Sequence, residues 1–267
     1  MNYLINGQPL TDWIIEKGTM FRPPVTVESN MLQIPGQHGA VNAARFPIFA
    51  EPTLTLHLAT KRGVDIESAY IGLLAALMQP SLTVGREVNG VQQTATARLI
   101  SMTEADRGQG FARYTVILDL PDVFWYAAAE TSPSAVVPNT GWQPSLFRGS
   151  TAPNLNTVIQ VSGPITAIHV KDSPTGTGIS WAGAGMVAGQ YLYLDVATLK
   201  AWRTTGASQW TPGGTDVTSG VDYPPEGPLQ VWPIPNTTYG TVALLTIEAS
   251  GASSATQIRL RTKPAYI

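Results

Sequence analysis

The chain has 267 residues, enough for one large or two ordinary domains, and its composition is poor in charge. Charged residues make up only 13% of it, about half the usual share of ~25%, so much of the surface must be uncharged or covered by partners. The net charge of -2, without a run of Lys or Arg, argues against nucleic-acid binding. The absence of cysteine excludes disulfides and thiolate metal sites. No apolar run approaches the ~20 residues that span a bilayer, so we expect a soluble protein without membrane insertion.

The first sixty residues predict short strands interrupted by turns. Tyr3 to Ile5 reads as a strand that Asn6-Gly7 turns back on itself. Prolines and glycines between Arg22 and Ala40 exclude a helix there, and residues 33 to 42 are expected to form an irregular loop. Thr53 to Leu58 alternates strictly between polar and apolar side chains, which predicts a half-buried strand.

The segment from about residue 65 to 79 predicts the single helix of the chain. Asp65 is suited to cap its N-terminus, Glu67 places negative charge in its first turn, and Pro80 ends it. Apolar residues recur at three- and four-residue steps, so they predict one stripe that packs on a sheet. The stripe consists of Ile66, Ala69, Tyr70, Leu73, Leu74, Leu77 and Met78. We interpret this helix as part of a core, without chemistry of its own.

The segment after the helix predicts a hairpin followed by an antiparallel pair of long strands. Glu87 to Val91 contains Asn-Gly between extended arms, which is a strong hairpin signal. The second arm is expected to continue to Met102, and Phe111 to Leu120 is the next strand, across a polar loop at Thr103 to Gly110. Residues 1–130 are therefore predicted to form a β-barrel or β-sandwich domain with one α-helix.

The second half of the chain is rich in Gly and Pro and predicts short strands. Residues 131–153 carry four prolines and little periodicity, which is typical of a linker. Residues 154–267 contain short alternating segments separated by Gly/Pro turns, which predict a β-sandwich without a helix. These segments are Val158–Val161, Ile165–Val170, Tyr191–Val196, Leu229–Trp232, Val242–Ala249 and Thr256–Thr262. The predicted fold class is mainly β.

The residue types that carry chemistry do not assemble into a site in the sequence. The three histidines lack the spacing of metal ligands. Glu104 and Asp106 fall in the expected polar loop, where nothing in the sequence indicates burial. We therefore expect no catalytic residue, no metal and no cofactor. Trp202 and Trp210 are flanked by polar turns, so we expect them to be exposed and able to contact a partner or stack on a glycan.

Several short motifs occur in a characteristic order along the chain. They are the opening Tyr3-Leu-Ile-Asn-Gly7-x-x-Leu10, the bracketed Gln33-Ile-Pro-Gly36-Gln-His-Gly39, one helix after an alternating strand, and Asp122-Val-Phe-Trp125. In this layout the chain resembles the distal tail protein, or baseplate hub, of bacteriophages with long flexible tails. Members of that family often have proline where Val123 stands, and Arg-Asp where Gln37-His38 precede Gly39.

The resemblance implies a structural virion protein. It implies a first domain that closes with copies of itself into a ring, a homohexamer that continues the tail tube, and a galectin-like β-sandwich outside the ring. Pro35, Gly36, Gln37, His38 and Gly39 are then expected at the interface between copies. The implied partners are the tail tube protein, tail tip proteins and a receptor-binding protein. The implied location is the distal end of the tail, after assembly in the host cytoplasm.

Two other functions stay open at this stage. The tryptophan-rich sandwich suggests a carbohydrate-binding module that contacts a cell-wall glycan of the host. The second domain lacks the His-x-Asn-x-Arg and Trp-Gly-x-Glu patterns of sugar-binding galectins, so the implied fold does not imply lectin activity. An enzyme that degrades the cell envelope is the third hypothesis, and it lacks a supporting set of residues.

Overall fold

The computed structural model describes residues 3–20, 23–28, 31–32, 41–42, 47–128 and 132–267. The chain divides into two compact units, the first extending to Tyr126 and including Ile267, and the second running from Ala127 to Tyr266. Most of the ordered structure is β-strand, which confirms the predicted mainly-β class. Within the described ranges, no helix is long and apolar enough to cross a membrane.

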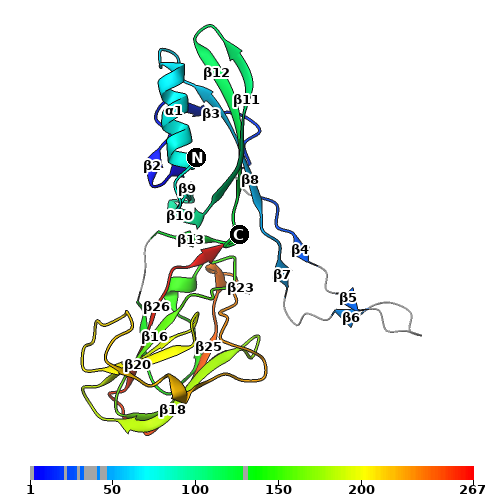
Figure 1. Cartoon of the computed structure of the whole chain (residues 1–267). Coiled ribbons are helices and arrows are strands. Elements are labelled where there is room, and N and C mark those ends of the chain that lie inside the picture. The colour runs from blue at the N-terminus through cyan, green and yellow to red at the C-terminus, as the bar shows by residue number, and fades with distance from the viewer. Residues whose placement is uncertain (1–2, 21–22, 29–30, 33–40, 43–46, 129–131) are drawn as a thin grey trace. The chain divides into compact units, whose positions relative to one another are not determined.

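The described residues of the first unit form two sheets, two short strand pairs and one helix (Figure 1). The strands of this unit follow the order β2-β1-β9-β10-β13 in one sheet and β11-β12-β8-β3 in the other, and among the described residues neither sheet closes into a barrel. The pairs are β4 with β7 and β5 with β6. The elements are β1 (Tyr3–Ile5), β2 (Gln8–Pro9), β3 (Trp13–Ile15), β4 (Val27–Glu28), β5 (Met31–Leu32), β6 (Val41–Asn42), β7 (Ile48–Phe49), β8 (Thr53–Thr60), α1 (Ile66–Leu77), β9 (Thr83–Val88), β10 (Val91–Thr96), β11 (Arg98–Gly108), β12 (Phe111–Asp119) and β13 (Trp125–Ala127).

Helix α1 begins and ends close to the predicted bounds. Asp65 is its N-cap, and the carboxylate accepts a hydrogen bond from the Ser68 amide. Leu73 is buried on the inner face with Ala69 and Leu77, and Tyr70 stacks on Tyr114 of β12 at 5.4 Å between ring centroids. The predicted stripe is nevertheless too wide, because the Met78 side chain is 68% exposed.

The predicted hairpin of the first unit is confirmed, whereas two predicted strand boundaries are wrong. The Asn89-Gly90 hairpin is confirmed, with both residues at positive φ between β9 and β10. The second arm ends at Thr96, and β11 begins a different sheet, so the predicted continuation to Met102 is wrong. The predicted loop from Thr103 is also wrong, because pairing between β11 and β12 extends to Gly108 opposite Phe111.

A buried cation organises the end of the first unit. Arg86 of β9 is almost fully buried, its Nε donates to Gln93 Oε1 at 2.9 Å, and its Nη2 donates to the main-chain oxygen of Ile267 at 3.0 Å. The guanidinium lies 4.1 Å from the ring centroid of Trp125, which adds a cation–π contact. Burial raises the pKa of neighbouring Tyr3 to about 12, although the Arg86 charge opposes the shift. The Tyr3 hydroxyl donates to the Met20 carbonyl at 2.7 Å.

Val123 adopts an unusual backbone conformation. Its φ of 65° lies in the region that β-branched residues avoid. The Phe124 amide donates to the Asp122 carbonyl at 2.7 Å, which closes a γ-turn on Val123, and the Val123 amide donates to Leu120 at 2.9 Å. Proline cannot adopt this φ and lacks the amide hydrogen. The turn of this chain therefore has a geometry that excludes proline at position 123.

The second unit is a β-sandwich of a six-stranded and a five-stranded sheet, which confirms the predicted fold of this region. The orders are β14-β26-β16-β19-β20-β21 and β15-β25-β17-β18-β22. The elements are β14 (Ser134–Val136), β15 (Asn139–Trp142), η1 (Ser145–Phe147), β16 (Val158–Ser162), β17 (Ile165–Asp172), β18 (Gly178–Met186), β19 (Tyr191–Asp195), β20 (Lys200–Thr204), β21 (Thr215–Asp216), η2 (Thr218–Gly220), β22 (Val221–Asp222), β23 (Ile234–Asn236), β24 (Gly240–Val242), β25 (Leu245–Ser250), β26 (Gln257–Arg261) and β27 (Ala265–Tyr266).

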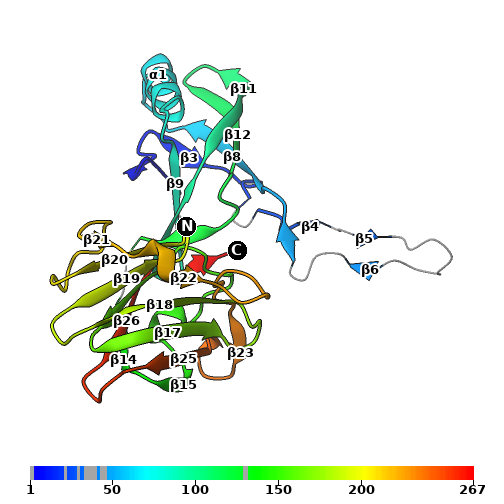
Figure 2. The same cartoon turned by 60° about the horizontal axis from the view of Figure 1, so that its bottom comes forward.

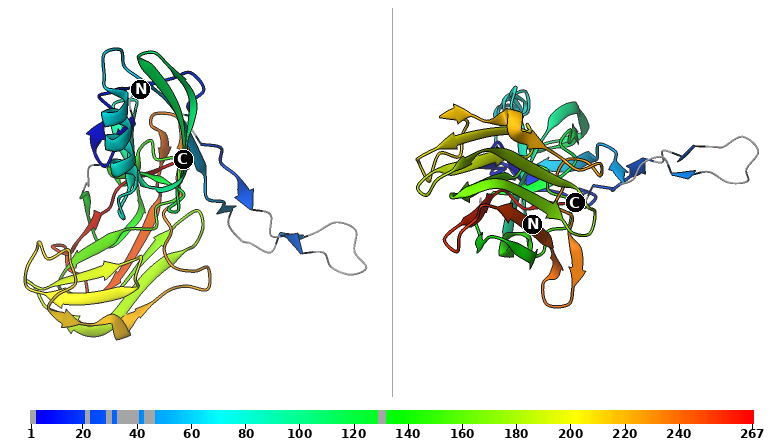
Figure 3. Two further views of the ribbon diagram at one scale, coloured as in Figure 1. Left: turned by 45° about the horizontal axis from the view of Figure 1, so that its top comes forward. Right: turned by 90° about the horizontal axis from the view of Figure 1, so that it is seen from below.

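One apolar core fills the space between these two sheets. The two sheets lie face to face (Figures 2 and 3). Alternate side chains of β16, β19 and β26 meet alternate side chains of β17, β18 and β25, as expected for aligned sheets. Fully buried members include Ile159, Leu194 and Leu260 from one sheet and Val170 and Ile247 from the other. The core of this unit is therefore continuous.

The predicted linker at residues 131–153 is wrong for most of its length. Ser134–Val136 and Asn139–Trp142 form edge strands β14 and β15, which pair with β26 and β25. Phe147 of η1 is buried in the sandwich core. Prolines at the ends of edge strands do not interrupt a ladder, so a Pro-rich segment can still belong to a sheet.

Asp172 is a carboxylate buried at the end of β17. Its Oδ2 accepts hydrogen bonds from the amide and hydroxyl of Thr175 at 3.2 and 2.6 Å, and its Oδ1 accepts one from the Trp232 amide at 3.3 Å. Burial raises the pKa of Asp172 to about 6, although these hydrogen bonds act in the opposite direction. Asp172 therefore fixes a loop while carrying a desolvated charge.

Candidate functional site

The edge strand β11 is the first candidate surface. In the described part of the chain it has a strand neighbour on one side only, β12. Its register skips Ile100 and Ala105, and such bulges are common at sheet edges. The bulged Ile100 side chain is 56% exposed. An edge with free backbone groups and an exposed apolar side chain is suited to pairing with another chain.

The C-terminal half of β11 carries charged side chains that form ion pairs, unlike the apolar edge at Ile100. Arg107 pairs with Glu104 at 3.6 Å and with Glu67 of α1 at 3.7 Å, and Arg113 pairs with Asp106 at 3.4 Å. The Tyr114 hydroxyl donates to Glu104 at 3.0 Å, and burial together with this bond raises the pKa of Tyr114 to about 12. These carboxylates thus lie on a strand among cations, and not in the loop that the sequence predicted.

Exposed apolar side chains continue over other parts of the first unit. Ile71 on the outer face of α1 is 58% exposed, although most helices of soluble proteins are polar on that face. Val27 and Ile48 are exposed on the β4–β7 pair, and an isolated two-stranded ribbon is marginally stable in water. We call the exposed large apolar side chains of this unit its open surface. It comprises Ile14, Met20, Val25, Val27, Ile48, Ile71, Met78, Ile100 and Phe111.

The predicted interface loop lies outside the described residues. Pro35, Gly36, Gln37, His38 and Gly39 fall between β5 and β6 in the sequence, and their role at an interface stays a prediction. The adjoining β4–β7 pair carries part of the open surface.

The two tryptophans proposed to be exposed lie together but differ in exposure. Trp202 is only 3% exposed, so its predicted exposure is wrong. Its ring stacks on Tyr193 at 5.4 Å and 3° between planes, and Trp210 meets the same Tyr193 ring edge-on at 5.5 Å. Trp210 is half-buried, so a contact role for it stays a prediction.

Residues 205–210 explain why this aromatic cluster is closed. The segment folds over the outer face of the six-stranded sheet, where the Tyr193 hydroxyl donates to the Gly206 carbonyl at 2.8 Å. The Trp202 Nε1 group donates to the Gln209 carbonyl at 3.0 Å, and Gln160 Nε2 donates to Ala207 at 2.6 Å. The polar turns that suggested exposure are therefore the cover of the cluster.

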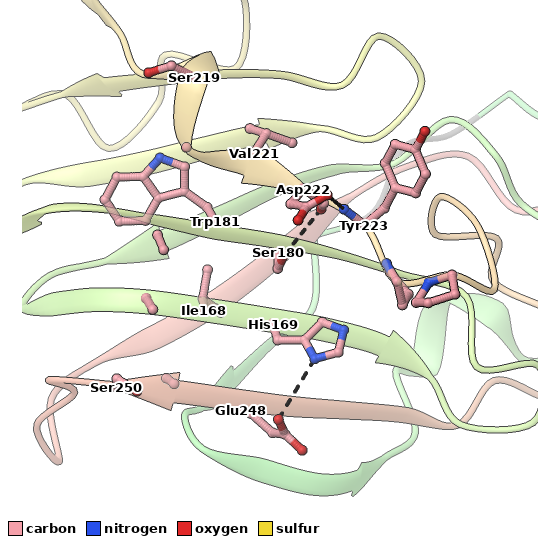
Figure 4. Close-up of a pocket in the computed structure, with 16 residues that line it drawn as sticks. Ile168, His169, Ser180, Trp181, Ser219, Val221, Asp222, Tyr223, Glu248 and Ser250 are labelled. Atoms are coloured by element: carbon pink, nitrogen blue, oxygen red, sulfur yellow. Dashed lines mark hydrogen bonds and ion pairs between the residues drawn. The ribbon is translucent and has the colours of Figure 1, made fainter.

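A groove on the outer face of the five-stranded sheet is the second candidate surface (Figure 4). It has a volume of about 780 Å³, and strands β17, β18 and β25 form its floor. The segment after β22, beginning with Tyr223, forms one wall. In the floor, His169 Nδ1 lies 3.8 Å from Glu248 Oε2, and the Ser180 hydroxyl donates to the Asp222 carbonyl at 3.2 Å.

The groove could not be found from the sequence. Strand alternation places His169 and Ser180 on the outer face of their strands, because Val170 and Trp181 point into the core. No local signal places Glu248 and Asp222 beside them. Only the pairing of β25, β17, β18 and β22 brings these segments together.

Within the described ranges, no group of three or more His, Cys, Asp or Glu side chains is arranged to hold a metal ion. The first unit offers apolar contacts and strand pairing, and the groove of the second unit offers hydrogen-bonding side chains.

Comparison with solved structures identifies the fold. The chain is similar to the SPP1 Dit (gp 19.1) protein, with a TM-score of 0.64 and 15% sequence identity over 98% of this chain and 98% of that chain. That protein is described as a paradigm of the hub adsorption apparatus in phages that infect Gram-positive bacteria. The shared fold therefore extends along both chains.

Weaker matches and sequence comparisons add no further argument. The phage p2 baseplate in its activated conformation, solved with Ca and with Sr, aligns with 100% of this chain and 99% of that chain at 12% identity, with a TM-score of 0.43. No protein-family model and no curated protein sequence matches the chain.

Proposed function

We propose that this chain is a structural hub protein at the distal end of a bacteriophage tail. The first unit joins copies of itself, six in number, into a ring that meets the tail tube protein on one side and a tail tip protein on the other. The second unit offers a docking surface to a receptor-binding protein. The protein assembles in the host cytoplasm and acts without catalysis.

The single observation that carries this proposal is the fold shared with a phage hub protein along nearly the whole of both chains. A common fold alone does not establish a common function. The proposal therefore also rests on surface chemistry, which does not depend on the comparison.

The open surface supports self-association. The described residues of the first unit expose nine large apolar side chains, and we infer that copies of the chain cover part of them. They occur on both edges of one sheet, since Ile100 lies on β11 and Ile14 lies on β3. Two different edges that meet head to tail generate a closed ring when the rotation between copies allows it.

The two competing functions have less support. A glycan platform built on Trp202 fails because that side chain is packed beneath residues 205–210. An envelope-degrading enzyme based on Glu104 also lacks support. The Glu104 carboxylate accepts a hydrogen bond from the Tyr114 hydroxyl and pairs with Arg107 on the edge strand β11.

An image of the labelled particle tests the proposed location. The protein carries a C-terminal affinity tag in phage particles, and a gold-labelled antibody marks the tag in electron micrographs. Gold at the tail end remote from the capsid is the expected result. Gold on the capsid or along the tail, or tagged protein absent from intact particles, contradicts the proposal.

A further inference from the structure

We propose that the groove on the second unit binds a neutral saccharide through side chains of the outer sheet face. This inference goes beyond the hub function, because a hub can assemble with or without a ligand in this groove. It rests on two adjacent rows of side chains that strand pairing sets across the floor.

The first row consists of small side chains. Ala167 of β17 lies opposite Ser250 of β25 on one side and opposite Ala182 of β18 on the other. Three short side chains in line leave a hollow over the sheet, and the groove volume of about 780 Å³ is in the range of small-molecule sites. A flat ring can therefore lie against the sheet here.

The second row consists of hydrogen-bonding side chains. His169 lies opposite Glu248 on one side and Ser180 on the other, and Ser180 lies opposite Asp222 of β22. The rows are two residues apart along each strand, which is about 7 Å. A ring over the small row therefore brings its hydroxyl groups within reach of the polar row.

The chemistry of the polar row matches sugar hydroxyl groups. Carboxylates accept, the Ser180 hydroxyl accepts while its hydrogen is donated to the Asp222 carbonyl, and the His169 ring nitrogens offer one donor and one acceptor when neutral. Sugar hydroxyls need both partners. The Tyr223 side chain is exposed on the wall beside Pro224, where an aromatic ring can cover the C–H face of a sugar.

The charge of the groove and the pairing of its strands favour a neutral saccharide over a phosphate polymer or a peptide. Glu248 and Asp222 bring two negative charges against one histidine, which disfavours a phosphate-bearing polymer. A peptide that adds a strand needs an open sheet edge, whereas Ser180 and Trp181 of β18 are already paired with β22. A neutral saccharide fits both constraints.

The most direct test of the groove is a variant in which a large side chain fills it. Ala182→Trp fills the small row, and Ala184→Trp is its control, because Ala184 is an exposed alanine on the same strand that does not line the groove. Glu248→Gln removes a charged acceptor from an exposed position and leaves the fold unchanged. Equal melting temperatures for all variants establish that each is folded.

Binding is measured on the full chain by saturation-transfer NMR and calorimetry. The probes are maltotriose, lactose and chitotriose, with polyglycerol phosphate and a proline-containing peptide as contrasts. We expect at least one neutral saccharide to bind. Ala182→Trp and Glu248→Gln each weaken binding at least about tenfold, and Ala184→Trp leaves it unchanged.

Three results overturn the inference. They are no binding of any neutral saccharide, binding of the phosphate polymer or the peptide alone, and saccharide binding that Ala182→Trp does not weaken. The oligomeric state, measured on the same samples, tests the hub function separately, so the failure of one proposal can be told from the failure of the other.

Discussion

The two units of this chain differ in how many of their large apolar side chains are exposed. Of the fourteen exposed large hydrophobic side chains in the described residues, nine belong to the first unit and five to the second. The second unit closes a continuous core between two sheets and covers its outer aromatic cluster with residues 205–210. Among the described residues, the first unit exposes Ile100 on edge strand β11 and Ile71 on the outer face of its helix.

This difference teaches where each unit obtains its stability. A sandwich with one core buries the inner faces of both its sheets within a single chain. A unit that exposes apolar side chains on several elements gains further burial only from partners, as the subunits of permanent assemblies do. We therefore assign the proposed self-association to the open surface of the first unit and the proposed ligand binding to the groove of the second.

Leu73→Asp is the largest expected perturbation and affects the first unit alone. Leu73 is 4% exposed in the core beneath α1, so an unpaired carboxylate there costs several kcal/mol against a typical total of about 5 to 15. Calorimetry should show the transition of the first unit lost and that of the second retained. Ile71→Asp, on the exposed face of the same helix, should shift the monomer's stability by no more than about 0.5 kcal/mol. A parental melting profile for Leu73→Asp contradicts the assigned inner face.

Val123→Pro is expected to cause the next largest loss of stability, and it tests the strained turn of the first unit. Proline cannot reach a φ of 65° and removes the hydrogen bond to Leu120, so we expect a loss on the order of 3 kcal/mol. Val123→Gly keeps the backbone and relieves the strain, so it should stay within about 1 kcal/mol of the parent. Chemical denaturation measures both. A proline variant as stable as the glycine variant would show that the γ-turn does not form.

Asp172 gives a smaller, pH-dependent effect confined to the second unit. Its folded pKa of about 6 lies above the ordinary value of 3.8, so the folded state binds the proton more tightly. The stabilisation is complete below about pH 3.8 and is lost as the pH rises through about 6, and it amounts to at most about 3 kcal/mol. The melting temperature of the second unit, relative to that of Asp172→Asn, should fall between pH 4 and 7. Parallel profiles for the two proteins contradict this assignment.

Local patterns in the sequence were sufficient for elements that local forces determine. The Asp65 cap, the Asn89-Gly90 turn and the alternation of Thr53 to Leu58 each depend on neighbouring residues, and each appears where it was predicted. The mainly-β class follows from the same patterns.

The failures share a cause, since each depends on a distant segment. Polar residues from Thr103 to Gly108 form a strand because β12 pairs with them. Trp202 is buried because residues 205–210 fold back over it, and Phe147 joins a core built from strands far along the chain. The groove needs four strands in register, and no window of the sequence contains them.

The native mass of the purified protein tests the central claim that the open surface joins copies of the chain. The measurement compares the parent with Ile100→Lys, which places a charge on the edge of β11, and with Val187→Lys, which replaces an apolar residue of the second unit that is at least as exposed as Ile100. We predict a ring for the parent, monomers for Ile100→Lys, and an intact ring for Val187→Lys. A parent that stays monomeric at high concentration, or an Ile100→Lys variant that assembles as the parent does, contradicts the claim.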